Sequence, residues 1–136
     1  MVKSAAREAA MKLLYACKLG GEDTSDAVTE QSGYAELSPR DETLCRKLVD
    51  GVREKDEELR KVIALHAQGW NIERIGIVEL CLLEMAVYEI LYMPKIPLGA
   101  SINEAVELAK IYCDEKSPAF LNGILGTIGK QFRSLV

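Results

Sequence analysis

The sequence predicts an all-α protein that folds as a single domain over residues 1–136. Apolar side chains recur at helical spacing in segments that follow helix-capping residues. No segment shows the sustained alternation of apolar and polar residues that is typical of a strand. Hydrophobic residues make up 49% of the 136 residues, which is enough for a core without disulfides or metal. We expect seven helices in two subbundles, residues 1–68 and 71–136, that share one core.

The first two predicted helices are separated by a pair of glycines. Residues 4–19 form the first helix, and glycines follow at residues 20–21, where a left-handed C-terminal cap falls. Thr24 and Ser25 can cap a short acidic helix that ends near Gly33. We expect the first helix to bury a narrow face made of Ala6, Ala10, Leu13 and Cys17.

The next two predicted helices begin at a strong start signal. Residues 38–41, Ser-Pro-Arg-Asp, place an N-cap, a first-turn proline and a first-turn carboxylate in the preferred order. Gly51 marks an expected bend, after which a further helix continues towards His66. The apolar positions of both helices recur at helical spacing: Leu44, Leu48, Val52, Leu59, Val62 and Ile63.

The C-terminal half contains three predicted helices. A long apolar helix starts at the cap Asn71 and ends before residues 94–97, Pro-Lys-Ile-Pro. Ser101 and Glu104 have the spacing of a capping box at the start of the next helix, and Ser117 precedes a proline at the start of the last one. The expected core residues of these two helices are Ala105, Leu108, Ala109, Phe120, Ile124 and Ile128.

The long apolar helix is interrupted by three glutamates. Glu79, Glu84 and Glu89 stand five residues apart, so successive ones point about 140° away from each other. Their charge argues against a membrane span, and their divergence argues against a shared active site. Apolar residues surround the rest of the helix. The helix is therefore either buried on all sides or presents one arc to a partner.

Basic charge is concentrated at the N-terminal end of an acidic chain. The net charge of −4 excludes a protein that coats nucleic acid over its whole surface. On a helix, Lys3, Arg7 and Lys18 fall within about 60° of one another, beside Met11 and Tyr15. Such a face is either a surface for single-stranded RNA, where phosphates pair and bases stack, or a solvated helix face.

The sequence contains no recognisable catalytic or metal-binding motif. The four cysteines form no CxxC pair, and His66 is the single histidine, so a zinc set is incomplete. We interpret the cysteines as small buried thiols, which fits a reducing cytoplasm. A thiol enzyme that pairs one cysteine with His66 is an alternative. We expect no catalysis, no metal and no cofactor.

The C-terminal half contains a series of short motifs. Tyr88-Glu89 is followed by Ile96-Pro97, by SINEAVELAK at residues 101–110 and by FLNGIL at residues 120–125. In their order and spacing these motifs resemble the NusB family. AREA at residues 6–9 and LY at residues 14–15 match as well, so the likeness covers essentially the whole chain. It implies a seven-helix NusB-like fold of two packed subbundles and no catalysis.

The resemblance also implies a role in bacterial transcription antitermination. In that role, NusB proteins hold boxA RNA together with NusE, a small-subunit ribosomal protein, in the transcription elongation complex. The RNA-binding residues carried over to this chain are Lys3, Arg7, Lys116, Ser117 and Phe120. The partner-binding residues carried over are Glu79, Tyr88 and Glu89. We expect a cytoplasmic protein that does not bind a membrane.

This chain departs from the family pattern at three places. Residues 3–6, Lys-Ser-Ala-Ala, stand where many members have a run of arginines. Glu84 replaces an arginine, and Gly126 replaces an aspartate. The alternative function is a helical interaction module without RNA binding, which forms a homodimer through the arc from Leu80 to Tyr88.

Overall fold

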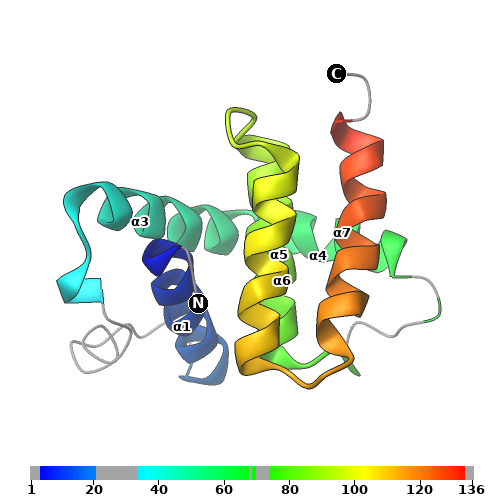
Figure 1. The fold of residues 1–136 in the computed structure, drawn as a ribbon, viewed down its shortest axis with the longest axis horizontal. Helices are drawn as coiled ribbons and strands as arrows, with labels where there is room; N and C mark the ends of the chain where they lie inside the picture. Colours follow the sequence, from blue (N-terminus) through cyan, green and yellow to red (C-terminus); the bar gives the residue numbers. More distant parts are fainter. Residues whose placement is uncertain (1–3, 21–33, 68, 70–73, 134–136) are drawn as a thin grey trace.

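The computed structural model describes residues 4–20, 34–67, 69 and 74–133. Within these ranges the chain forms α-helices, one short 3-10 helix and no strand, which confirms the predicted all-α class (Figure 1). The helix expected to end near Gly33 and the cap expected at Asn71 lie outside the described residues. The elements are α1 (Ala5–Gly20), η1 (Tyr34–Glu36), α3 (Pro39–Glu54), α4 (Asp56–His66), α5 (Ile77–Tyr92), α6 (Leu98–Tyr112) and α7 (Ser117–Arg133).

The start of α3 follows the local sequence signal. Ser38 adopts an extended backbone, and its hydroxyl accepts a hydrogen bond from the backbone N–H of Asp41 at 3.2 Å. The bend expected at Gly51 is wrong, because α3 continues to Glu54 and the break falls at Lys55. Gly51 is instead buried inside the helix, where a neighbouring helix approaches it closely.

The capping box expected at the start of α6 is also wrong. The helix begins at Leu98, directly after Pro97, whose fixed φ suits entry into a helix. Ser101 and Glu104 are consequently inside α6 and buried. Both side chains contact other helices rather than the end of their own.

Helix α5 is the central element of the bundle. It packs against α1, α3, α4, α6 and α7. In Figure 1, α1 stands on one side of the α5–α6 pair and α7 on the other, while α3 lies on the α1 side and runs from there towards α5. From Leu80 to Ile90 all side chains of α5 except Tyr88 are buried, which favours the first of the two alternatives, burial on all sides, for this part of the helix.

Two further expectations concern the chain as a whole. None of the helices in the described ranges has the length and apolar character needed to cross a membrane. The predicted division into two subbundles falls at residues that lie largely outside the described ranges, so it stays a prediction.

Candidate functional site

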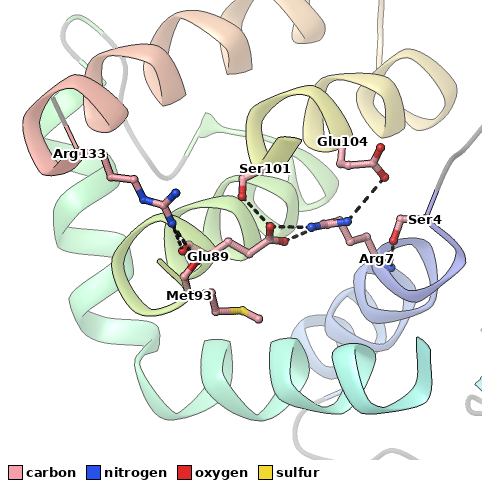
Figure 2. A network of polar contacts seen from close by, with 7 residues as sticks. All are labelled: Ser4, Arg7, Glu89, Met93, Ser101, Glu104 and Arg133. Atoms are coloured by element: carbon pink, nitrogen blue, oxygen red, sulfur yellow. Dashed lines mark hydrogen bonds and ion pairs between the residues drawn. The ribbon is translucent and has the colours of Figure 1, made fainter. Parts of the chain in front are cut away.

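Glu89 lies at the centre of a polar network that joins α1, α5 and α6 (Figure 2). Its carboxylate accepts hydrogen bonds from Arg7 Nε at 2.8 Å, from Arg7 Nη2 at 2.9 Å and from Ser101 Oγ at 2.7 Å. Arg7 Nη1 also lies 3.8 Å from Glu104 Oε1. The Glu89 side chain is 1% exposed and that of Arg7 is 13% exposed. The predicted RNA contact Arg7 and the predicted partner contact Glu89 thus bind each other in the interior.

The charge of Arg7 is compensated where it lies. Burial lowers the pKa of its guanidinium, but the hydrogen bond and charge of Glu89 and the charge of Glu104 raise it above the usual value. The two parallel bonds to one carboxylate form the bidentate geometry that arginine favours. The backbone N–H of Arg7 donates to Ser4 Oγ at 3.1 Å, so the same residue also takes part in the cap of α1. Arg7 therefore fixes α1 against α5 and α6.

Arg133 holds the C-terminal end of α5. Its guanidinium donates to four backbone carbonyl oxygens around that end, three of them in or next to the last turn of the helix. The carbonyls belong to Glu89, Ile90, Met93 and Ile96, of which Figure 2 shows the contacts to Glu89 and Met93. The last carbonyls of a helix lack a full set of intrahelical partners, and here a single side chain from α7 adds donors to them. The sequence offered only a weak signal for this role, a basic residue in the last turn of α7.

The predicted residues Lys116, Ser117 and Phe120 line one open groove beside Glu79. The groove has a volume of about 840 Å³ and lies between the end of α4, the start of α5 and α7. Lys116 is exposed and Phe120 is half-buried, whereas Ser117 is buried. The Ser117 hydroxyl donates to Glu79 Oε2 at 2.8 Å. One predicted partner contact and three predicted RNA contacts are therefore neighbours.

Asp114 fixes the start of α7 at this groove. Its Oδ1 accepts hydrogen bonds from the backbone N–H groups of Lys116 at 2.9 Å and Ser117 at 3.1 Å. The bond from Lys116, followed by those from Ser117, lowers the pKa of the Asp114 carboxyl. Lys116 is thus presented from a fixed turn. The remaining RNA prediction, Lys3, lies outside the described residues.

Tyr88 packs on α3 instead of standing free. Its ring lies so close to Gly51 that an added Cβ there would be 2.2 Å from Tyr88 Cζ. The ring of Tyr92 lies beside it, with the centroids 5.2 Å apart. Leu80 and Glu84, on the same arc of α5, are buried. Burial of Leu80 and Glu84 removes part of the arc that the homodimer alternative would use, and that alternative stays a prediction.

Glu84, the departure from the family pattern on α5, is completely buried beside Lys18 and Asp56. Lys18 Nζ lies 2.7 Å from Glu84 Oε1 and 3.6 Å from Asp56 Oδ1. Neither oxygen of Glu84 receives a well-oriented hydrogen bond. Burial, followed by the hydrogen bond with Asp56, raises the pKa of Glu84 to about 8, although Lys18 opposes this shift. The hydrogen bond between Glu84 and Asp56 also lowers the pKa of the Asp56 carboxyl.

The cysteines and His66 do not form an activated pair in the described structure. Burial raises the pKa of the Cys45 thiol to about 11 and the pKa values of Cys81 and Cys113 to about 12. A nucleophilic cysteine needs the opposite shift. The ring nitrogens of His66 lie 2.8 Å from the carbonyl oxygen of Val62 and 2.6 Å from Gln131 Oε1, so both are engaged elsewhere.

Sequence reasoning missed Tyr112, an aromatic residue of α6 that contacts Glu8 and Lys12 of α1. The hydroxyl of Tyr112, the last residue of α6, donates to Glu8, and Lys12 Nζ lies 5.8 Å from the centroid of the Tyr112 ring. Tyr15 is exposed on α1, three residues after Lys12. The basic residues of α1 beside Tyr15 were visible in the sequence, but the contribution of Tyr112 from α6 was not.

Comparisons with known proteins point to one family. A sequence model of the NusB family matches residues 4–130. The transcription antitermination protein NusB of Ruminiclostridium cellulolyticum is 40% identical over 130 residues, which cover 96% of this chain and 90% of that protein. The protein of the same name from Carboxydothermus hydrogenoformans is 41% identical over 135 residues, which cover 96% of this chain and 94% of that protein.

Solved structures agree with the sequence relatives. The structure of NusB from T. maritima superposes with a TM-score of 0.84 at 27% identity and covers 96% of this chain and 94% of that chain. A NusB chain from a crystal structure of the antitermination factors NusB and NusE in complex with double-stranded RNA superposes with a TM-score of 0.81 at 29% identity; the match covers 94% of this chain and 96% of that chain. Sequence and fold together show that this chain belongs to the NusB family.

Proposed function

We propose that this chain is a non-catalytic RNA-binding adaptor in bacterial transcription antitermination, which binds boxA-type single-stranded RNA together with NusE. The observation that carries the proposal is 40% identity, over 96% of the chain, to a protein named for transcription antitermination. The solved complex of NusB and NusE with double-stranded RNA supports NusE and RNA as partners, and the single-stranded boxA-type RNA is part of the proposal. We place the adaptor in the transcription elongation complex, in the cytoplasm.

The groove at the start of α7 is the proposed contact with RNA. It combines an exposed cation, Lys116, with the half-buried ring of Phe120. A cation for the phosphate and an aromatic face for the base are the two elements of single-strand binding. Ser117 has its hydroxyl engaged by Glu79, so we assign it the role of holding the turn. Lys3 is retained as a predicted RNA contact from the sequence.

The proposed partner surface lies on α5, but one of its three predicted residues has an indirect role. Glu79 and Tyr88 are partly exposed and remain candidates for contact with NusE. Glu89 is closed off by Arg7 and Ser101, so we propose that it acts on the partner only by holding the helices in place. Leu80 and Glu84 are buried, so we favour NusE over a second copy of this chain as the partner on this side of α5.

The proposal can be tested by fluorescence anisotropy with a labelled boxA-type RNA. We expect the chain with NusE to bind it more tightly than either protein alone, and more tightly than an RNA of permuted sequence. Binding should weaken with salt, because each phosphate contact on a single strand contributes a slope of about −0.7. Equal binding of the boxA-type and permuted RNAs, or no gain from NusE, would contradict the proposed function.

The contribution of the groove is tested by Phe120→Leu. Leucine keeps apolar volume against the core but removes the aromatic face, so RNA affinity should fall by about 1–3 kcal/mol without a change in salt slope. Phe132→Leu, an exposed aromatic on the same helix but absent from the groove lining, is the matched control. Unchanged affinity in a Phe120→Leu protein that melts like the parent would remove Phe120 from the RNA surface.

A further inference from the structure

The cations of α1 are not equally available to a ligand. Arg7 binds Glu89 at 2.8 Å and lies near Glu104, and its side chain is 13% exposed. Lys18 lies 2.7 Å from Glu84 with a side chain that is 19% exposed. Both cations are thus engaged by carboxyl groups of other helices: Arg7 by the Glu89 carboxylate, and Lys18 by Asp56 at 3.6 Å as well as by Glu84. A phosphate that drew Arg7 away would leave the buried Glu89 carboxylate without its counter-charge.

Lys12 is the exception on α1. Among the described residues its ammonium makes no ion pair with a carboxylate, and it lies over the ring of Tyr112. A contact with an aromatic face uses the positive charge but leaves N–H donors free. Lys12 is therefore the described cation of α1 that can reach a phosphate without breaking an ion pair.

Tyr112 is held in place next to this cation. Tyr112 is 38% exposed, and its hydroxyl donates to Glu8 on α1. That bond, followed by burial, raises the pKa of Tyr112 to about 12, so the hydroxyl stays protonated and Glu8 stays occupied as its acceptor. Contacts from two residues of α1 fix an aromatic surface that remains open to solvent. A fixed, exposed ring loses little conformational freedom when a base stacks on it.

We propose that Lys12 and Tyr112 together form a nucleotide-binding site for single-stranded RNA, in which the Lys12 ammonium binds a phosphate and the Tyr112 ring stacks on a base. The site rests on the proposed RNA-binding function and extends it to α1 and the end of α6. Arg7 is a positioning residue for this site: it holds α1 against α5 and α6 but makes no phosphate contact.

The test measures RNA affinity across a range of salt concentrations, with the chain and NusE together and a boxA-type RNA. Lys12→Gln should lower affinity and reduce the magnitude of the salt slope by about 0.7, the value of one phosphate contact. Lys61→Gln is the matched control, because Lys61 is exposed on α4 and lies 3.6 Å from Glu57. Arg7→Gln should leave the slope unchanged, even where its effect on helix packing lowers affinity.

Two substitutions of Tyr112 separate stacking from hydrogen bonding. Tyr112→Leu should weaken RNA binding about 5- to 100-fold with no change of slope, whereas Tyr112→Phe keeps the ring and should bind like the parent. Melting temperatures of all variants are measured alongside. If the parent binds and both Lys12→Gln and Tyr112→Leu match it in affinity and slope, the site is refuted while the proposed function stands. If the parent itself fails to bind, both fall.

Discussion

Two buried glutamates on α5, five residues apart, are satisfied in opposite ways. Glu89 accepts two hydrogen bonds from Arg7 and one from Ser101. Glu84 has one ammonium beside it and shares its surroundings with a second carboxyl, that of Asp56. Burial raises the pKa of Glu84 to about 8, so its carboxyl is largely protonated at neutral pH. Burial alone therefore does not decide whether a carboxyl is charged. The number and geometry of the hydrogen-bond donors around it do.

The largest expected effect comes from breaking the Glu89 pair. Arg7→Met leaves a buried carboxylate with only the Ser101 hydroxyl as a donor, so the free energy of unfolding should fall by about 3–5 kcal/mol. Urea denaturation measures this. The double variant Arg7→Met/Glu89→Met removes both charges and should recover most of the loss.

Lys18→Met is the matched substitution beside the other glutamate, Glu84. Lys18→Met removes the ammonium beside Glu84, but a protonated Glu84 leaves no charge behind, so the loss should be smaller than for Arg7→Met. Equal losses for Lys18→Met and Arg7→Met would show that Glu84 is ionised in the folded protein.

The packing of the Glu84 face against α3 gives a smaller effect. In Gly51→Ala the new Cβ would lie 2.2 Å from Tyr88 Cζ, so the ring must move. Overpacking costs about 1–3 kcal/mol, against a gain of about 1 kcal/mol from replacing glycine in a helix. We expect a net loss of stability in thermal unfolding.

Gly126→Ala is the control for that substitution. A Cβ at Gly126, where the family has aspartate, meets nothing within 4 Å. This variant should therefore gain up to about 1 kcal/mol from helix propensity alone. A stabilising Gly51→Ala of the same size would show that Tyr88 yields without cost.

An effect of similar size to that of Gly126→Ala is a pH dependence carried by Glu84. Because the pKa of Glu84 is higher in the folded than in the unfolded chain, the folded state binds the extra proton. Its contribution to stability is therefore present below about pH 4 and is lost as the pH rises towards about pH 8.

Glu84→Gln removes this titration. Between about pH 6 and about pH 7 the variant should gain up to about 1.4 kcal/mol relative to the parent. Urea denaturation at the two pH values measures the difference. Parallel stability curves for parent and variant would mean that Glu84 does not titrate in this range.

Local signals in the sequence were sufficient to predict most of the helices. The cap at Ser38 with its following proline, the helical spacing of Leu48 and Val52, and the proline-rich end of α5 all operate within a few residues of the chain. The continuous apolar character of α5 also predicted that it would be central. These features depend on backbone conformation and on the total apolar surface, which short segments specify.

The tertiary structure alone decided which side chains meet. Arg7 and Glu89 are separated by 82 residues in sequence, and no spacing rule relates them. Ser101 and Glu104 satisfy the pattern of a capping box, yet they bind α5 and α1 because α6 starts earlier. Lys12 is the available described cation of α1 because Arg7 and Lys18 are engaged by carboxyl groups of other helices. A charge on a helix is free or compensated according to what packs against it, and that depends on all the other helices at once.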